Sequence, residues 1–376
     1  MRILQISSAP VTYEGGTERV VWEISKRLAK KHKVTVLQTD LYAQEHKKGV
    51  SYTDHVKIIT FKNDFYLGGY GFSSKAIKWL KENWKDYDVV HSHGYNRFLT
   101  EFSVFILKNK VPIIFTPHGF IHTKKNYLFK IAHDQTFGKF IQRADICTAL
   151  TKLDFKDYGK LGVKREKIVE IPNGVDLKQF QKIKKRDISI FKKKYGLSKT
   201  ILFVGRIHES KGLQYVIEAI KDLDCKLLII GEDSGYKKIL EEKIKSLDIA
   251  DKVIFAGNLR DKEKIKAYHS CDALVLYSEW EGFGITVIEA MASGKPVIVS
   301  NRGSLPFLVN NKKEGFIVKF KDITDLRKRI ELILTNKEES KKMGMNGKKK
   351  AKNYEWNKIV GMYLNVYKRI LKKNDK

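Results

Sequence analysis

The sequence predicts an α/β protein with two doubly wound parallel sheets. Short apolar runs alternate with amphipathic stretches along almost the whole chain, and strands that are buried on both faces and separated by helices are typical of parallel sheets. The runs form two series, which indicates two domains. The strands expected in the first series are residues 2–7, 34–38, 88–91 and 112–116. Those expected in the second are residues 200–205, 226–231, 252–256, 273–277 and 296–300.

The length of the chain agrees with two domains, because 376 residues exceed the ~250–300 at which a single core stops growing. We expect an N-terminal domain over residues 1–180 and a C-terminal domain over residues 181–353. Residues 178–195 are rich in lysine and lack a long apolar pattern, so we expect a solvated connector there. Helical periodicity predicts a last helix, and we expect residues 354–376 to pack back on the N-terminal domain.

The chain is strongly basic, with 73 Lys and Arg against 43 Asp and Glu and a net charge of +30. The charge is spread over both halves and accompanies no helix-turn-helix, zinc-finger or RNA-recognition signature, so we expect no nucleic-acid partner. Three widely spaced cysteines give no disulfide framework. The sequence also lacks an apolar run of spanning length and a signal peptide. We expect a cytoplasmic protein and keep open a peripheral position on an anionic membrane surface.

The loops that follow the expected strands are the first place to look for a ligand site, because doubly wound sheets bind ligands at the carboxyl ends of their strands. Residues 8–19 follow the first strand and contain Gly15 and Gly16. Two glycines let the backbone approach a ligand closely, and the helix beyond them offers free amides to an anion. A plain tight turn explains the pair equally well.

A second segment, residues 205–211, directly follows an expected strand of the second series. Arg206 and Lys211 are two cations at a strand-to-helix junction, which suits a diphosphate: Arg206 would bind as a fork and Lys211 as a point charge. A pair of solvated surface cations is the alternative.

A third segment, residues 279–296, contains Gly282 and Gly284 in a loop that opens a helix. The first amides of that helix are suited to a phosphate. Glu289 lies inside the helix among apolar residues, so its carboxylate is expected to be buried and to need a partner. A sugar or ribose hydroxyl is one candidate partner, and a Lys or Arg side chain is the other.

Taken together, six motifs resemble those of retaining, nucleotide-sugar-dependent glycosyltransferases of family 4 (glycosyl transferases group 1). They occur in the family's order over about residues 1–300 and are specific as a set. They are Gly15-Gly16, His91-Ser92-His93-Gly94, Thr116-Pro117-His118-Gly119, Ile171-Pro172-Asn173-Gly174-Val175-Asp176, the stretch from Gly205-Arg206 to Lys211, and Glu281 with Glu289. The resemblance implies the GT-B fold, in which two Rossmann-like domains face each other across a cleft.

The resemblance also implies an activity: transfer of a hexose from a UDP- or GDP-sugar to a sugar or lipid-linked acceptor, with retention of the anomeric configuration. It assigns catalytic roles to four residues, namely His118 near the reaction centre, Arg206 and Lys211 on the donor diphosphate, and Glu281 on the transferred sugar. It assigns Glu289 to the ribose of the nucleotide. It also implies that Gly16, which belongs to the opposite domain, closes on the donor diphosphate. The other donor-binding residues are Gly15, Gly282, Phe283, Gly284, Ile285 and Thr286, and the acceptor-side residues are His93 and Asn173.

We expect no metal and no other cofactor. His91 and His93 have a spacing that suits a metal pair, but the sequence offers no identifiable third ligand. Asp86 and Asp88 have the Asp-x-Asp pattern of another glycosyltransferase fold, yet they precede a strand, at the end opposite a ligand site, so we interpret them as structural. Arg206 and Lys211 meet the donor charge instead. A same-face substitution, in which the leaving phosphate takes the acceptor proton, agrees with the lack of an assignable acid–nucleophile carboxylate pair.

Two segments are candidates for the acceptor side. Residues 65–72 are aromatic and rich in glycine, which predicts a mobile cleft loop. Residues 120–140 mix aromatic residues with lysines, and this pattern fits either a segment that meets a membrane surface or an ordinary core helix with a basic face. Another nucleotide-sugar enzyme, such as an epimerase, and a basic nucleic-acid-binding protein are the alternative functions.

Overall fold

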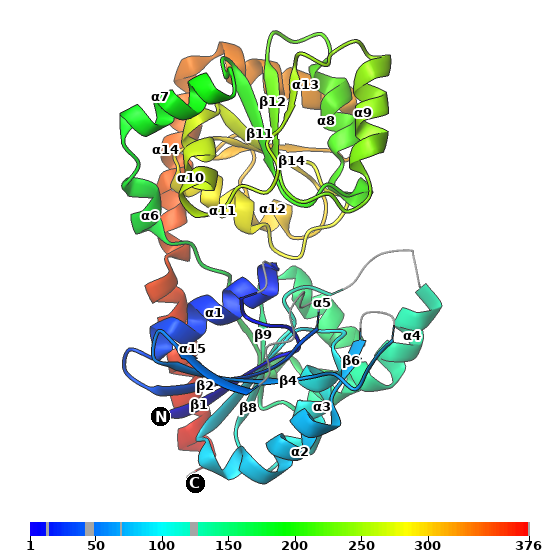
Figure 1. Ribbon diagram of the computed structural model, residues 1–376, viewed down its shortest axis with the longest axis vertical. Coiled ribbons are helices and arrows are strands. Elements are labelled where there is room, and N and C mark those ends of the chain that lie inside the picture. Colours follow the sequence, from blue (N-terminus) through cyan, green and yellow to red (C-terminus); the bar gives the residue numbers. More distant parts are fainter. Residues whose placement is uncertain (13–14, 42–48, 68–69, 121–126, 375–376) are drawn as a thin grey trace. The chain divides into compact units, whose positions relative to one another are not determined.

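The computed structural model describes residues 1–376 except 13–14, 42–48, 68–69, 121–126 and 375–376 (Figure 1). The chain divides into two compact units. Unit 1 comprises Met1–Gly174 with Trp356–Lys376, and unit 2 comprises Val175–Glu355. The observed boundaries therefore lie six residues before the first expected one and two after the second.

Unit 1 is built on an eight-stranded sheet of order β10-β9-β8-β7-β1-β2-β4-β3. All neighbours are parallel except β3, which runs antiparallel to β4. Because β1 lies between β2 and β7, the direction of winding reverses there. The strands are β1 Arg2–Ser7, β2 Lys33–Thr39, β3 Gly49–Thr53, β4 Val56–Phe61, β7 Val89–His93, β8 Ile113–Thr116, β9 Ile146–Ala149 and β10 Ile168–Glu170.

The helices of unit 1 cover this sheet because one face of each is apolar. Helix α1 packs beside α15, and α2 packs beside α3 on the other side of the sheet (Figure 1). In α15 the buried positions include Ile359, Tyr363, Tyr367 and Ile370, spaced three or four residues apart. The α-helices are α1 Gly16–Leu28, α2 Ser74–Asn83, α3 Phe98–Leu107, α4 Tyr127–Gln135, α5 Leu153–Lys160 and α15 Trp356–Asn374.

Unit 2 is built on a six-stranded, wholly parallel sheet of order β13-β12-β11-β14-β15-β16. Its winding reverses between β11 and β14. The strands are β11 Thr200–Val204, β12 Lys226–Ile230, β13 Val253–Phe255, β14 Ala273–Leu276, β15 Val297–Ser300 and β16 Gly315–Val318. The α-helices are α6 Leu177–Gln181, α7 Lys185–Lys194, α8 Leu213–Ile220, α9 Lys237–Ser246, α10 Asp261–Ser270, α11 Ile285–Ala292, α12 Leu305–Leu308, α13 Ile323–Thr335 and α14 Lys337–Ala351.

Two local expectations are wrong. Residues 178–195 are not a solvated connector, because α6 and α7 occupy most of this stretch and α7 packs against α10. Phe180 and Phe191 are buried, so two aromatic anchors replace the long apolar pattern. Residues 65–72 are not a loop: β5 Phe65–Leu67 and β6 Tyr70–Phe72 pair antiparallel, and residues 68–69 lie outside the described part. The rings of Phe65 and Phe72 stack with centroids 5.0 Å apart and hold this hairpin together.

In the segment 120–140, residues 121–126 lie outside the described part, and the rest forms α4 and a 3-10 helix over Phe137–Arg143. Within the described residues, no helix has both the length and the apolar character needed to cross a membrane.

Candidate functional site

The segments 205–211 and 279–296 come together at the edge of the unit 2 sheet where β11 and β14 end. This is the point where the winding reverses, and open α/β sheets bind ligands in the crevice formed there. The loop after β11 and the loop after β14 are joined by a backbone hydrogen bond, in which Glu279 N–H donates to the Ser210 carbonyl oxygen at 2.8 Å. Gly212 has a φ of +69°, and a Cβ there would lie 2.1 Å from the Tyr277 carbonyl oxygen. A glycine is therefore required for this close approach.

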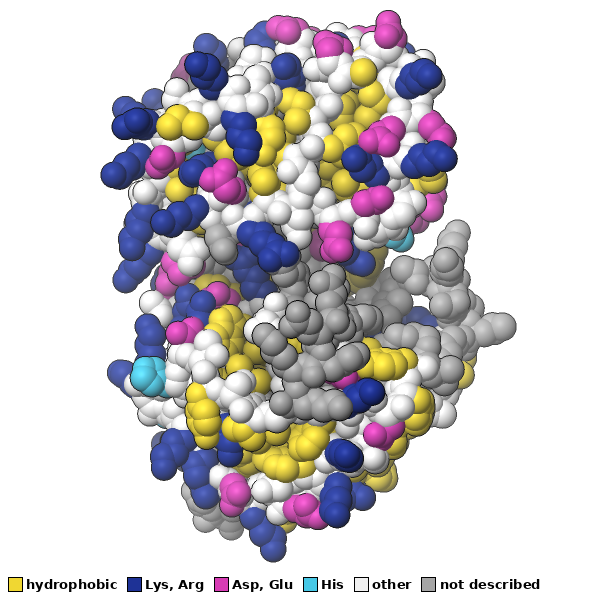
Figure 2. Space-filling view, in the orientation of Figure 1, with side chains coloured by type: hydrophobic (Ala, Val, Ile, Leu, Met, Phe, Trp, Pro, Cys, Tyr) yellow, Lys and Arg dark blue, Asp and Glu magenta, His cyan; other side chains and the backbone are white. Residues whose placement is uncertain are grey.

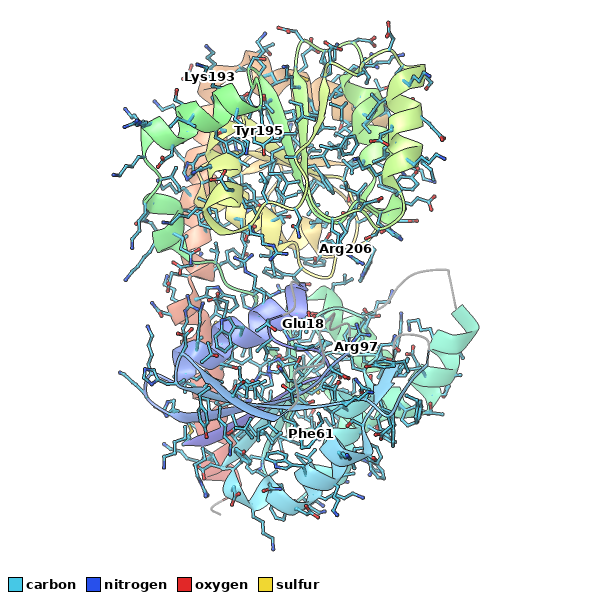
Figure 3. All side chains as sticks on the ribbon, viewed as in Figure 1. Glu18, Phe61, Arg97, Lys193, Tyr195 and Arg206 are labelled. Atoms are coloured by element: carbon cyan, nitrogen blue, oxygen red, sulfur yellow. The ribbon has the colours of Figure 1, made fainter. Side chains whose placement is uncertain are left out.

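Two site residues form an ion pair across these loops. Lys211 Nζ lies 2.7 Å from Glu281 Oε2, and the side chains are 15% and 20% exposed. Ser278 Oγ donates a second hydrogen bond to the same carboxylate oxygen at 3.3 Å. Arg206, on the loop that follows β11, is exposed (Figure 3). The site thus presents one fixed cation and one solvent-accessible cation from the same loop.

The N-terminus of α11 adds backbone donors to the same edge. Gly284 caps this helix with a φ of +97°, and within the described residues no side chain caps it. A Cβ at Gly284 would lie 3.0 Å from Leu305 Cδ2, so both the conformation and the space favour glycine. The amides of Ile285 and Thr286 belong to the uncapped first turn, where an anion is stabilised. Gly282 and Phe283 lie in the loop that leads to it, and the Phe283 side chain is buried.

Glu289, inside α11, is almost fully buried, with 2% of the residue exposed. Its carboxylate lies 2.9 Å from Lys264 Nζ and accepts a hydrogen bond from the Tyr268 hydroxyl at 2.7 Å. The sequence left two candidate partners for this carboxylate, a sugar or ribose hydroxyl and a Lys or Arg side chain. The structure shows the second, because a lysine contacts it. The pair lies on α10 and α11.

In unit 1, the histidine and asparagine motifs also lie at carboxyl ends of strands. His93 ends β7, His118 follows β8, and Asn173 follows β10. His118 has a φ of +57°, a left-handed conformation that is uncommon for a residue with a side chain. His118 Nδ1 and Asn173 Oδ1 are both buried, and neither has a hydrogen-bond partner among the described residues. Each is a position where a ligand can supply the missing partner.

The histidines belong to a buried polar network that sequence reasoning missed. His93 Nδ1 lies 2.9 Å from His118 Nε2, and His93 Nε2 lies 2.6 Å from Gln5 Oε1. Gln5 also donates to the Tyr367 hydroxyl on α15. The one signal in the sequence is Gln5 itself, a polar residue in the middle of an otherwise apolar strand. Burial lowers the pKa of His118 to about 3 and lowers the pKa of His93 well below its ordinary value.

The His91/His93 pair and the Asp86/Asp88 pair do not form a metal site within the described residues. His91 is hydrogen-bonded through both ring nitrogens, to Tyr367 and Thr116, each at 2.7 Å. Asp88 lies at the amino end of β7, where its carboxylate lies 3.0 Å from the Arg2 guanidinium. The described residues contain no group of three or more His, Cys, Asp or Glu side chains that could hold a metal ion.

The glycine loop of unit 1 is described only in part, because residues 13–14 lie outside the described chain. Gly15 is the N-cap of α1 and has an extended conformation. A Cβ at Gly16 would meet no atom within 4 Å. Packing within the described residues therefore does not require glycine at position 16.

Both halves of the chain match known families. Residues 14–179 match the family described as Glycosyltransferase Family 4, and residues 184–350 match the family described as Glycosyl transferases group 1. An uncharacterized glycosyltransferase of Methanocaldococcus jannaschii is 29% identical over 95% of each chain. The O-antigen chain mannosyltransferase C of Escherichia coli is 25% identical over 99% of each. The structure of HepE from Anabaena in complex with UDP covers 98% of this chain and all of its own with a TM-score of 0.82 and 19% identity.

Proposed function

The chain belongs to glycosyltransferase family 4, has the GT-B fold and is a hexosyltransferase; from this premise we propose a donor and an acceptor class. We also propose the stereochemistry of the transfer. The donor is a UDP- or GDP-hexose and the acceptor is a sugar or a lipid-linked sugar. The transfer retains the anomeric configuration and needs no metal. The observation that carries the donor assignment is the grouping of Arg206, Lys211, Glu281 and the free first turn of α11 at the reversal point of the unit 2 sheet.

Four groups at this edge suit the donor diphosphate, because each of them is positively charged or donates hydrogen bonds. Arg206 binds phosphate oxygens as a two-pronged donor, Lys211 binds as a point charge, and the amides of Ile285 and Thr286 complete the set. Glu281 then accepts hydrogen bonds from hydroxyls of the hexose while it remains paired with Lys211. Glu289 accepts from the ribose. HepE, which shares the fold, has been crystallised with UDP and with UDP-glucose, in line with such a donor.

The reaction breaks the bond between the anomeric carbon and the phosphate oxygen. It forms a bond from that carbon to the acceptor oxygen on the same face, and the acceptor proton passes to the leaving phosphate. Negative charge grows on the diphosphate as the bond breaks. In this proposal Arg206 and Lys211 lie beside that charge, and removal of one such donor typically lowers the rate ~10²–10³-fold. In this scheme the two cations neutralise the leaving group, which is why we propose that no metal takes part.

A donor-binding experiment tests this assignment. We expect UDP, GDP or one of their hexose derivatives to raise the melting temperature of the protein, and the Arg206→Ala variant to lose the effect while it still folds. Lys199→Ala is the matched control: Lys199 is exposed and immediately precedes β11, so it lies at the opposite end of the same strand. If no nucleotide or nucleotide sugar stabilises the wild-type protein, the donor assignment fails.

Stereochemistry and metal dependence have their own tests. The anomeric proton of the product, observed by NMR, should show the configuration of the donor, and an inverted product contradicts retention. Activity should survive EDTA without change. A loss of activity that added Mg²⁺ or Mn²⁺ restores would contradict the metal-independent mechanism.

A lipid-linked acceptor is favoured by one feature of unit 1. A cavity of ≈ 410 Å³ lies between α2 and α3, with Phe72, Ile77, Phe98 and Phe102 in its walls and Lys78 and Lys81 among its lining residues. Exposed aromatic side chains continue this surface at Phe105 and Phe137. Figure 2 shows hydrophobic side chains over this part of unit 1 with Lys and Arg side chains around them.

Apolar side chains with basic neighbours suit the boundary of an anionic membrane, where each Lys or Arg near the surface contributes about 1 kcal/mol. Co-sedimentation with vesicles tests this: we expect binding to vesicles that contain anionic lipid and little binding to neutral ones. The Lys78→Glu/Lys81→Glu variant should lose it, whereas Lys199→Glu in unit 2 should not. Equal sedimentation with both kinds of vesicle would remove the support for a membrane-bound acceptor.

A further inference from the structure

A chain of hydrogen bonds inside unit 1 connects helix α15 to His118. The Tyr367 hydroxyl lies 3.2 Å from Gln5 Nε2, Gln5 Oε1 lies 2.6 Å from His93 Nε2, and His93 Nδ1 lies 2.9 Å from His118 Nε2. Gln5, His93 and Tyr367 are at most 1% exposed. Four side chains from four separate parts of the sequence thus form one continuous path, and three of them are shielded from solvent.

The direction of this path follows from the chemistry of its members. A neutral imidazole carries one N–H and one lone pair, and an amide oxygen only accepts. Because Gln5 Oε1 faces His93 Nε2, that nitrogen carries the proton and His93 Nδ1 is the acceptor. His118 Nε2 must then donate to His93 Nδ1, and His118 Nδ1 is left with a lone pair.

Both rings have a fixed number of protons near neutral pH. Burial lowers the pKa of His118 to about 3, and burial followed by the neighbouring His91 and His118 lowers that of His93 well below its ordinary range. Each ring is therefore neutral and carries a single N–H, so the tautomer of one determines the tautomer of the other.

The other end of the Gln5 amide meets the Tyr367 hydroxyl, whose bonding to His91 fits this orientation of the amide. The hydroxyl of Tyr367 also lies 2.7 Å from His91 Nδ1, and His91 Nε2 lies 2.7 Å from Thr116 Oγ1. When Tyr367 gives its one proton to His91, its oxygen is free to accept from Gln5 Nε2. The amide oxygen of Gln5 is then directed to His93.

We propose that Tyr367, Gln5 and His93 are positioning residues that hold His118 as its Nε2–H tautomer, so that His118 Nδ1 accepts a hydrogen bond from a hydroxyl of the ligand. Two further observations point to a ligand at this nitrogen. His118 Nδ1 is buried with no partner among the described residues, and His118 has a left-handed backbone of the kind that is concentrated at functional sites. That the hydroxyl belongs to a sugar rests on the proposed function.

This arrangement discriminates by chemistry. A lone pair at Nδ1 accepts from a hydroxyl and repels a phosphate or carboxylate oxygen, whereas an N–H at Nδ1 would attract the anion. The tautomer therefore favours a neutral polyhydroxyl group at this position. Helix α15 thus controls the protonation of His118 Nδ1 on the loop after β8. This helix lies more than 180 positions further along the chain than the rest of unit 1.

The tautomer is measurable by NMR of protein labelled with ¹⁵N-histidine. Long-range ¹H–¹⁵N correlations show which ring nitrogen carries the proton, and a His118→Gln sample identifies the His118 signals. We expect His118 and His93 both to be protonated at Nε2 at neutral pH. A proton on His118 Nδ1 would mean that the Gln5 amide is turned the other way, and this result overturns the proposal.

Three variants test the positioning roles. Tyr367→Phe removes the hydroxyl that orients the amide, and Gln5→Met removes the amide, so each should convert the single His118 tautomer into a mixture. Tyr363→Phe is the matched control: Tyr363 lies one turn earlier on the same helix and is equally buried, but within the described residues its hydroxyl is bonded to neither Gln5 nor His91. A purely structural role for Tyr367 would lower stability without changing the tautomer, and that outcome also overturns the proposal.

Kinetics separate this inference from the proposed function. Tyr367→Phe should lower kcat/KM for a nucleotide-sugar donor by about 2- to 10-fold, the range of one lost hydrogen bond, and should leave the affinity for the free nucleoside diphosphate unchanged. If His118 has the expected tautomer but no sugar is transferred, the proposed donor and acceptor fail and the tautomer control stands. If transfer occurs and the tautomer is the opposite one, the inference alone fails.

Discussion

The ammonium group of Lys211 and the carboxylate of Glu281 lie 2.7 Å apart, although 70 residues separate them in the chain. This ion pair links the loops that follow β11 and β14, next to the backbone hydrogen bond from Glu279 to Ser210. Both side chains are largely buried, so their geometry is fixed before any ligand arrives. In the proposed reaction this removes the need to reorganise the cation when charge develops on the leaving group.

Replacement of Lys211 by Ala should therefore affect catalysis more than folding. We expect the rate of sugar transfer to fall ~10²–10³-fold. The free energy of unfolding should fall by about 1 kcal/mol, because the two side chains keep 15% and 20% of their exposure to water, which weakens the ion pair. Steady-state kinetics and urea unfolding measure the two effects, with Lys199→Ala as the control. If Lys211→Ala is strongly destabilised but its remaining folded molecules transfer sugar at the wild-type rate, Lys211 does not act on the donor diphosphate.

The Gly16→Ala variant should separate ligand binding from packing. A Cβ at position 16 meets no described atom within 4 Å, and Ala is a better helix former than Gly, so stability should stay the same or rise by up to about 1 kcal/mol. If Gly16 contacts the donor diphosphate, as the family resemblance implies, the added methyl group displaces the donor, and a displacement of about 1 Å lowers the rate by about 10²-fold. Thermal unfolding and donor kinetics on the same sample check this. Full activity in a stabilised variant would show that Gly16 makes no contact with the donor.

Gly174 has a structural role, and its replacement should destabilise unit 1. A Cβ at this position would lie 2.4 Å from the Trp356 ring, at the start of α15. We expect Gly174→Ala to force the ring and the helix to move, at a cost of about 1–3 kcal/mol. Near-ultraviolet circular dichroism and urea unfolding should report the change at Trp356. Gly159→Ala, where a Cβ meets nothing within 4 Å, is the control.

The sequence predicts the two parallel sheets and the strands at their centres, because strands such as β1 and β11 are buried on both faces and appear as apolar runs. It does not predict α7, whose burial depends on one phenylalanine that meets α10 only after folding. The grouping of Arg206, Lys211 and Glu281 could be predicted, since each follows a central strand. The ion pair within that group and the path from Tyr367 to His118 could not, because they depend on distances between segments that are far apart in sequence.

The buried histidines should make the stability of the protein fall in mildly acidic solution. Burial lowers the pKa of His91 and of His93 well below the ordinary value of about 6.5, so the unfolded chain binds protons that the folded chain does not. The stabilising contribution of each ring is complete above pH ~6.5 and is lost as the pH decreases. One pH unit below that value, each ring should cost about 1.4 kcal/mol of unfolding free energy.

Urea unfolding at pH 7.5, 6.5 and 5.5 measures this slope. His91→Gln removes one of the titrating rings and should reduce the dependence on pH by about one proton, even though the variant is less stable at pH 7.5 because Tyr367 and Thr116 lose a partner. His208→Gln is the control, since His208 is exposed on the loop after β11 of unit 2. An unchanged slope in His91→Gln would mean that the His91 ring binds a proton in the folded protein, and the neutral network that orients His118 would then need a different description.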